Sequence, residues 1–174
     1  MKNSILVLVA AVLLFGCKKD NNNGGGYGTM RVKMTDAPGD YKEVNVDIKL
    51  VEIHHDGKWM ALPTNAGVYD LLKLRDSVTV PISDSVVISR GKVTQMRLIL
   101  GASNTVVVDS VGTFDLKVPS AYNTGIKINL DTDITVDQHL EIVLDYDAEQ
   151  SIHKTGSGEY IMEPVIKVRS VKTL

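Results

Sequence analysis

An all-β fold of two packed sheets is predicted by three features of the chain beyond residue 28. Apolar and polar residues alternate with a period of two, as in residues 30–34, MRVKM, which is typical of strands with one buried face. Gly, Pro, Asn, Asp and Ser recur between these runs at short intervals, as the turns of a sandwich require. Only at residues 68–74, VYDLLKL, does a short helix compete with a strand. We therefore expect one β-sandwich domain over residues 29–174.

The first strand should begin at Thr29 and end at the turn TDAPGD, residues 35–40. In the second, the apolar positions shift by one residue after Leu50, which predicts a β-bulge near Leu50 and Val51. Further strands are expected over residues 68–74, 78–82, 93–100, 105–109, 114–118, 126–130, 140–146 and 160–168. Pro164 indicates a sheet edge or a bulge in the last strand.

The dipeptide Asp56-Gly57 predicts a two-residue hairpin, because both turn positions require a positive φ. This hairpin pairs His54 with Trp59 and Ile53 with Met60. We expect the Ile53 and Met60 side chains to face the core, and His54 and Trp59 to lie together on the opposite face.

The N-terminus resembles a lipoprotein signal peptide over residues 1–16. Lys2 precedes eleven residues without a polar side chain, residues 5–15, which span only about 16 Å as a helix and are too short to cross a membrane. The Leu14-Phe15-Gly16-Cys17 sequence resembles a lipobox, which predicts acylation of Cys17, the chain's single cysteine. The alternative is an ordinary signal peptide with a chance cysteine.

Residues 17–28 then form a lipidated cysteine with a polar, glycine-rich tether, which would extend roughly 18 Å as a flexible coil. The Lys18-Lys19-Asp20 start is similar to signals that place lipoproteins on the cell surface in some Gram-negative phyla; the alternative is a solvated tether. We expect a location in the cell envelope, with the lipid in the outer membrane and the domain surface-exposed.

The net charge is −2, and −3 once Lys2 is removed with the signal peptide. This balance argues against nucleic acid as a partner, since binding to phosphates needs a basic surface. The expected partners are the membrane, through acylated Cys17, and an extracellular glycan or protein.

Five stretches carry a resemblance to a known family: residues 34–48, 93–100, 118–128, 144–152 and 159–168, which include MTDAPGDY and EPVIKV. They look like a domain-of-unknown-function family of Bacteroidetes-type envelope lipoproteins. The resemblance implies a Greek-key sandwich similar to transthyretin-like and carboxypeptidase-regulatory-like domains. We therefore expect an antiparallel Greek-key sandwich of two sheets, transthyretin-like or immunoglobulin-like, with at most one short helix. The resemblance implies no activity and no catalytic residues.

His54 and Trp59 are the candidate ligand-binding residues, because two rings on a solvent face can stack against a sugar; a cross-strand pair that merely covers the sheet is the alternative. Asp131, Asp133 and Asp137 are weak candidates for Ca²⁺, since the glycine and terminal glutamate of an EF-hand loop are missing. Solvated acids around a turn are the alternative. We expect no metal and no cofactor.

The sequence shows little that indicates an enzyme. Asp145 and Asp147 could form a carboxylate pair about 7 Å apart on one strand face, but solvent-facing or loop-pinning acids are the simpler interpretation. The glycine-rich residues 155–158, TGSG, lack the following helix that a phosphate-binding loop needs. We predict a non-enzymatic binding module, or alternatively an assembly subunit of a pilus-like or envelope complex that exchanges its first strand after processing at Arg31.

Overall fold

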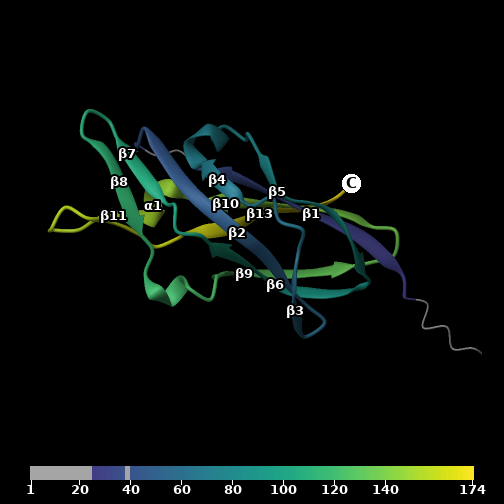
Figure 1. The fold of residues 1–174 in the computed structure, drawn as a ribbon. Coiled ribbons are helices and arrows are strands. Elements are labelled where there is room, and N and C mark those ends of the chain that lie inside the picture. Colours follow the sequence, from purple (N-terminus) through teal and green to yellow (C-terminus); the bar gives the residue numbers. More distant parts are fainter. Residues whose placement is uncertain (1–24, 38–39) are drawn as a thin grey trace, which may run out of the picture.

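The structure is a computed structural model that describes residues 25–37 and 40–174. The predicted signal peptide and Cys17 lie outside the described residues. The described residues fold into thirteen strands and three very short helical segments (Figure 1). The strands are β1 (Tyr27–Asp36), β2 (Glu43–His55), β3 (Lys58–Ala61), β4 (Gly67–Asp70), β5 (Val80–Ser89), β6 (Gly91–Leu100), β7 (Thr105–Val108), β8 (Gly112–Lys117), β9 (Ile126–Ile134), β10 (His139–Tyr146), β11 (Ile152–Lys154), β12 (Tyr160–Met162) and β13 (Ile166–Thr173).

The strands form two sheets, as the alternation of apolar residues predicts. The smaller sheet has four strands in the order β13-β10-β1-β5, and the larger has nine, with β11-β12-β8-β7-β2-β6-β9 in sequence and β3 and β4 on the free side of β2. The expected all-β sandwich is confirmed. Its sheets are mixed rather than purely antiparallel, because β1 pairs in parallel with β10, and β12 with β8.

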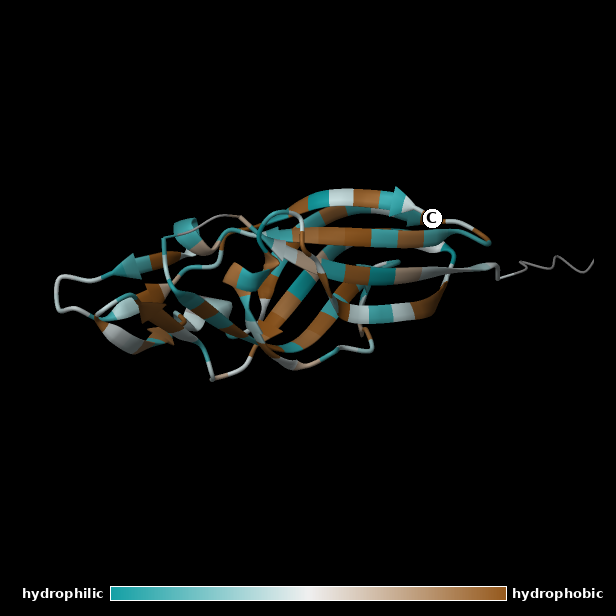
Figure 2. Ribbon diagram, turned by 90° about the horizontal axis from the view of Figure 1, so that it is seen from above, coloured by the Kyte–Doolittle hydropathy of each residue, from teal (hydrophilic) through white to brown (hydrophobic). Residues whose placement is uncertain are grey.

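The core lies between the sheets, where Figure 2 shows apolar residues on the strands of both layers. β1 contributes Met30, Val32 and Met34, and each of these side chains is fully buried. β10 contributes alternate residues, among them Ile142 and Leu144, from the neighbouring strand. The period-two alternation of β1 therefore marks its inner face correctly.

The bulge predicted in β2 is present. Buried positions run through Val44, Val46 and Ile48, and then through Val51 and Ile53, so the inward face changes by one residue. The pairing of β2 with β6 shifts between Ile48 and Leu50. The apolar side chains in both halves of this long strand therefore face the core.

The last predicted strand, residues 160–168, is wrong as a single strand. It is divided at Pro164 into β12, which joins the larger sheet, and β13, which joins the smaller one. Proline donates no hydrogen bond to a ladder and ends the pairing there, so the chain crosses between layers at this point.

The helical content of the described residues is small. It consists of α1 (Ala148–Ser151) and two 3₁₀ helices, Leu71–Leu74 and Ser120–Tyr122. Residues 68–74, where a strand and a short helix were both expected, contain both: β4 ends at Asp70, and a 3₁₀ helix follows over Leu71–Leu74. None of the helices in residues 25–37 and 40–174 has the length and apolar character needed to span a membrane.

Candidate functional site

The β2–β3 hairpin brings the two predicted ligand-binding residues together. Asp56 and Gly57 adopt φ values of 45° and 79°, as a two-residue hairpin requires, and His54 pairs directly with Trp59. The two ring centroids lie 5.1 Å apart with the planes at 55°. The His54 Nδ1 atom also lies 2.7 Å from the Thr94 hydroxyl. The predicted pairing is therefore confirmed.

A third side chain that the sequence reasoning missed completes this cluster. The guanidinium of Arg97 lies 4.2 Å from the centroid of a Trp59 ring, a distance at which a cation is attracted to the aromatic face. Glu52 forms an ion pair with the same guanidinium, and both side chains are only partly exposed. In residues 93–100, VTQMRLIL, Arg97 stands between the buried Met96 and Leu98, so its side chain points to the outer face of the sheet. This alternation could have predicted that Arg97 lies on the same face as His54 and Trp59.

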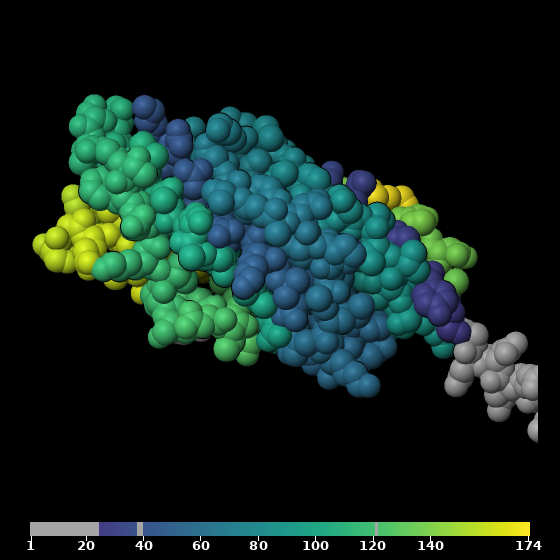
Figure 3. Space-filling model, viewed as in Figure 1, coloured from purple at the N-terminus to yellow at the C-terminus, as the bar shows by residue number. Residues whose placement is uncertain are grey.

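These residues belong to an ordered face on the outside of the larger sheet. The register places Trp59, His54, Gln95 and Asn129 in one row across β3, β2, β6 and β9. The adjacent row contains Ala61, Glu52, Arg97 and Lys127. We call the following residues the polar face: Glu52, His54, Trp59, Gln95, Arg97, Lys127 and Asn129. In the space-filling view of Figure 3, β2 and the β2–β3 hairpin lie toward the front.

The polar face presents groups that both donate and accept hydrogen bonds. The Gln95 amide donates to the Asn129 carbonyl oxygen at 3.3 Å, and each amide keeps further donor and acceptor capacity. All seven side chains are partly or fully exposed. Four strands at about 4.8 Å spacing make the row about 14 Å long. This row offers the Trp59 ring, the His54 ring and two amides, and the adjacent row adds the two cations Arg97 and Lys127.

The three weak Ca²⁺ candidates are not brought together. Asp131 forms an ion pair with the Lys92 ammonium at 2.8 Å, and Asp133 lines a nearby hollow. Asp137 sits in the β9–β10 turn with a φ of 59°. Within residues 25–37 and 40–174, no three His, Cys, Asp or Glu side chains converge as metal ligands.

The histidines lie apart from one another. His55 points to the face opposite His54, where it is buried and its Nε2 lies 3.1 Å from the Ser89 carbonyl oxygen. His139 contacts the Thr29 hydroxyl at 2.8 Å, and His153 lies 4.0 Å from Glu163 at an exposed position. These contacts agree with turn-flanking and surface roles.

Asp147 is a loop-pinning acid, as the simpler interpretation predicts. Its carboxylate accepts hydrogen bonds from the Gln150 amide nitrogen at 2.9 Å and from the Gln150 side chain at 2.6 Å. It thereby caps α1, while Asp145 remains on β10. Residues 155–158 form the loop of the β11–β12 hairpin, which also agrees with the prediction.

A buried acid that the sequence reasoning did not single out is Asp36, at the end of β1. Its side chain is 2 % exposed, and one carboxylate oxygen accepts from the Ala148 amide at 3.0 Å. The other oxygen has no hydrogen-bond partner among the described residues. Burial raises the pKa of Asp36 to about 7, and the nearby charges of Asp145 and Asp147 act in the same direction.

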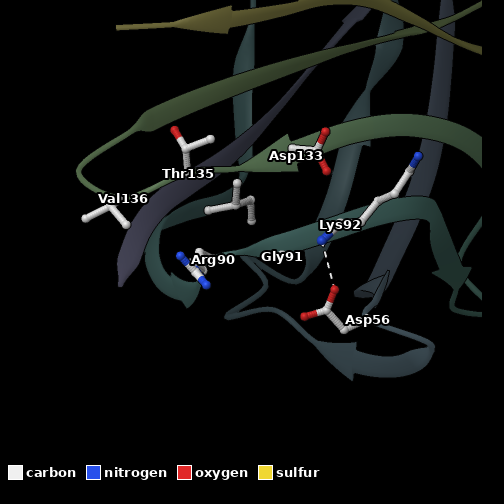
Figure 4. Close-up of a pocket in the computed structure, with 8 residues that line it drawn as sticks. Asp56, Arg90, Gly91, Lys92, Asp133, Thr135 and Val136 are labelled. Atoms are coloured by element: carbon white, nitrogen blue, oxygen red, sulfur yellow. Dashed lines mark hydrogen bonds between the residues drawn. The ribbon is translucent and has the colours of Figure 1, made fainter. Parts of the chain in front are cut away.

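A shallow hollow of about 430 Å³ lies at the opposite end of the sandwich (Figure 4). It is lined by Arg90, Gly91 and Lys92 around the start of β6, by Asp56 of the hairpin turn, and by residues 133–136, which end β9 and begin the following turn. The Lys92 amide donates to the Asp56 carboxylate at 2.9 Å. Side chains of both charges therefore surround one open cavity.

Comparison with known proteins identifies the domain at the level of its family. A family described as "Domain of unknown function (DUF4382)" matches residues 27–164, which span the sandwich from the start of β1 to the residue Pro164 between β12 and β13. No curated protein and no solved structure matches the chain. The match covers most of the chain, and the protein therefore belongs to the DUF4382 family.

Proposed function

We propose that this protein is a non-enzymatic, glycan-binding module of the bacterial cell envelope, held to the outer membrane through an acylated Cys17. The polar face is the observation on which the proposal depends. Sugar hydroxyls both donate and accept hydrogen bonds, and the Gln95 and Asn129 amides can do the same. Trp59 adds a ring on which the apolar side of a sugar can stack.

The arrangement of Trp59 favours recognition over mere coverage of the sheet. The Trp59 ring contacts His54 on β2 and Arg97 on β6. Glu52 forms an ion pair with Arg97 and so orients its guanidinium. A ring held in place loses little rotamer freedom on binding, so less of the interaction free energy is spent on ordering. The row extends across four strands, which suits an extended chain of sugars.

The lipoprotein part of the proposal is supported by the signal-like N-terminus and the single cysteine. The Bacteroidetes-type lipoprotein resemblance agrees with it. The alternative of an assembly subunit that exchanges its first strand finds less support, because β1 is paired on both sides, by β10 and by β5. Arg31 also forms an ion pair with Glu141 at 2.6 Å.

Glycan-array binding by the full chain, followed by titration, tests the proposal. Trp59 is the single tryptophan, so a glycan bound at the polar face should change its fluorescence directly. Gln95→Ala removes about one hydrogen bond, for which we expect roughly 5- to 10-fold weaker binding. Trp59→Ala should weaken binding more strongly.

Tyr27→Ala is the matched aromatic control, because Tyr27 is 59 % exposed and lies at the start of β1, in the smaller sheet, whereas this row lies on the larger one. It should bind as the wild type does. A folded wild-type protein that binds no glycan on the array, or glycan binding that survives both Gln95→Ala and Trp59→Ala unchanged, would contradict the proposal.

A further inference from the structure

At the end of the sandwich where β1 begins, residues 26 and 27 are hydrogen-bonded to two neighbouring loops. The Gly26 carbonyl oxygen accepts from the Arg90 amide at 2.8 Å, and the Tyr27 carbonyl oxygen accepts from the Asp137 amide at 2.8 Å. A Cβ atom on Gly26 would lie 2.1 Å from Val136 Cγ2, so the backbone passes directly against this side chain. We call this end, formed by Gly26, Tyr27, Arg90 and Val136, the tether end.

Two large apolar side chains are exposed at the tether end. Tyr27 is 59 % exposed and Val136 is 50 % exposed, and the two belong to segments that hydrogen-bond to each other. Tyrosine is enriched at the membrane interface, because its ring is apolar and its hydroxyl remains in contact with water and headgroups. The pair therefore has the chemical character of an interfacial contact.

The hollow beside Val136 carries charges of both signs. Arg90 and Lys92 contribute cations, and Asp56 and Asp133 contribute carboxylates (Figure 4). Asp131 and Asp137 add negative charge nearby, and the Lys92 ammonium is paired with Asp131. A surface of this kind is not attracted to an anionic membrane. It matches a headgroup that has one phosphate and one amine, since Arg can hold the phosphate and a carboxylate the amine.

The distance along the chain adds an independent argument. Cys17 and Tyr27 are ten residues apart in the sequence, so the linking segment spans at most about 35 Å when fully extended. A lipid at Cys17 therefore keeps the tether end close to the membrane surface. This raises the effective concentration of the contact, so even weak contacts would be occupied.

We propose that the tether end docks on a zwitterionic phospholipid surface, with Tyr27 and Val136 in the interfacial layer and a phosphoethanolamine-type headgroup in the hollow. This proposal depends on the acylation of Cys17 proposed above. It orients the sandwich with its long axis away from the membrane, so that the end that bears α1 and the β7–β8 hairpin points outward.

A nitroxide at position 136 tests the docking in the full lipidated chain. Acylation occupies Cys17, the single cysteine, so Val136→Cys provides one free thiol for labelling. The protein is reconstituted on vesicles of phosphatidylethanolamine and phosphatidylcholine. We expect the label to collide several-fold more often with oxygen dissolved in lipid, and several-fold less often with a water-soluble nickel complex, than the controls do.

Two valines serve as matched controls. Val87 is 64 % exposed and lies on β5 opposite Thr29, near the tether end but outside the hollow. Val111 is 63 % exposed in the β7–β8 turn at the other end. Docking places only the Val136 label in lipid, whereas a tether without docking gives equal accessibility at Val136 and Val87, and that result overturns the proposal.

Charge variants and mass measurement complete the test. Arg90→Glu should lower the fraction of Val136 label in lipid, whereas Arg169→Glu, on β13, should not. Adding phosphatidylglycerol should not increase docking, and a marked increase would overturn the zwitterionic assignment. Intact-mass measurement separates the two proposals: a bare Cys17 overturns the anchor together with the docking, whereas acylated Cys17 with equal accessibilities overturns the docking alone.

Discussion

The two ends of the sandwich use acidic residues in opposite ways. At the tether end, Asp131 is 82 % exposed and pairs with a Lys92 ammonium that is 53 % exposed. At the other end, which we call the far end and which contains Asp36, Tyr146 and α1, Asp36 is 2 % exposed and has one unpartnered carboxylate oxygen. The same residue type is therefore a solvated surface charge at one end and a costly buried group at the other.

Three of the five stretches that carry the resemblance, residues 34–48, 144–152 and 159–168, contact one another at the far end. The Ala148 amide donates to the Asp36 carboxylate at 3.0 Å, the Tyr146 hydroxyl donates to Met162 Sδ at 3.2 Å, and the Val165 amide donates to the Ser151 hydroxyl at 2.8 Å. The other two stretches, residues 93–100 and 118–128, supply Gln95, Arg97 and Lys127 to the polar face. Three of the five stretches thus take part in packing at the far end, and two take part in the proposed glycan contacts.

The largest effect is expected from Asp36→Asn. The folded protein raises the pKa of Asp36 from 3.8 to about 7, so folding takes up a proton between these pH values and stability falls as the pH rises through this window. Asparagine keeps the acceptor for the Ala148 amide but removes the charge. Between pH 4 and pH 8, the free energy of unfolding of the wild type should fall by about 2–4 kcal/mol more than that of the variant.

Chemical denaturation at a series of pH values measures this difference. Asp40→Asn is the control, because Asp40 is an exposed acid close by in the sequence and its replacement should leave the pH profile as in the wild type. Parallel profiles for wild type and Asp36→Asn would show that the buried carboxyl does not control stability at the far end.

An intermediate effect is expected from Asp147→Ala. This change removes the side chain that caps α1 through the Gln150 amide, and loss of an N-cap costs about 1 kcal/mol. Asp147→Asn should recover most of this stability, since an amide oxygen can also accept the bond. Urea midpoints of the two variants check the expectation, which fails if alanine and asparagine behave alike.

The smallest effect is expected from Asp131→Asn at the tether end. The Asp131–Lys92 ion pair is exposed on both sides, and such pairs contribute little because water and salt screen them. The thermal midpoint should stay within experimental error of the wild type in both low and high salt. A clear loss of stability would mean that the tether end is held together electrostatically, contrary to the comparison of the two ends.

Local chemistry made several parts of the fold predictable. The Asp56-Gly57 turn sets the register of β2 and β3, and therefore the pairing of His54 with Trp59. The parity shift at Leu50–Val51 revealed the bulge, because one extra residue exchanges the two faces of a strand. The division of residues 160–168 between two sheets was not predictable, since Pro164 marks an interruption but says nothing about where the chain continues.

The alternation, the turn residues and the hairpin dipeptide were enough to establish a two-layered β fold and the contact between His54 and Trp59, because each depends on residues close together in the chain. Only the tertiary structure placed Arg97 over Trp59 and enclosed Asp36 beneath Ala148. Both contacts join residues far apart in sequence, and their formation depends on the order in which the elements pack, for which no local pattern carries the information.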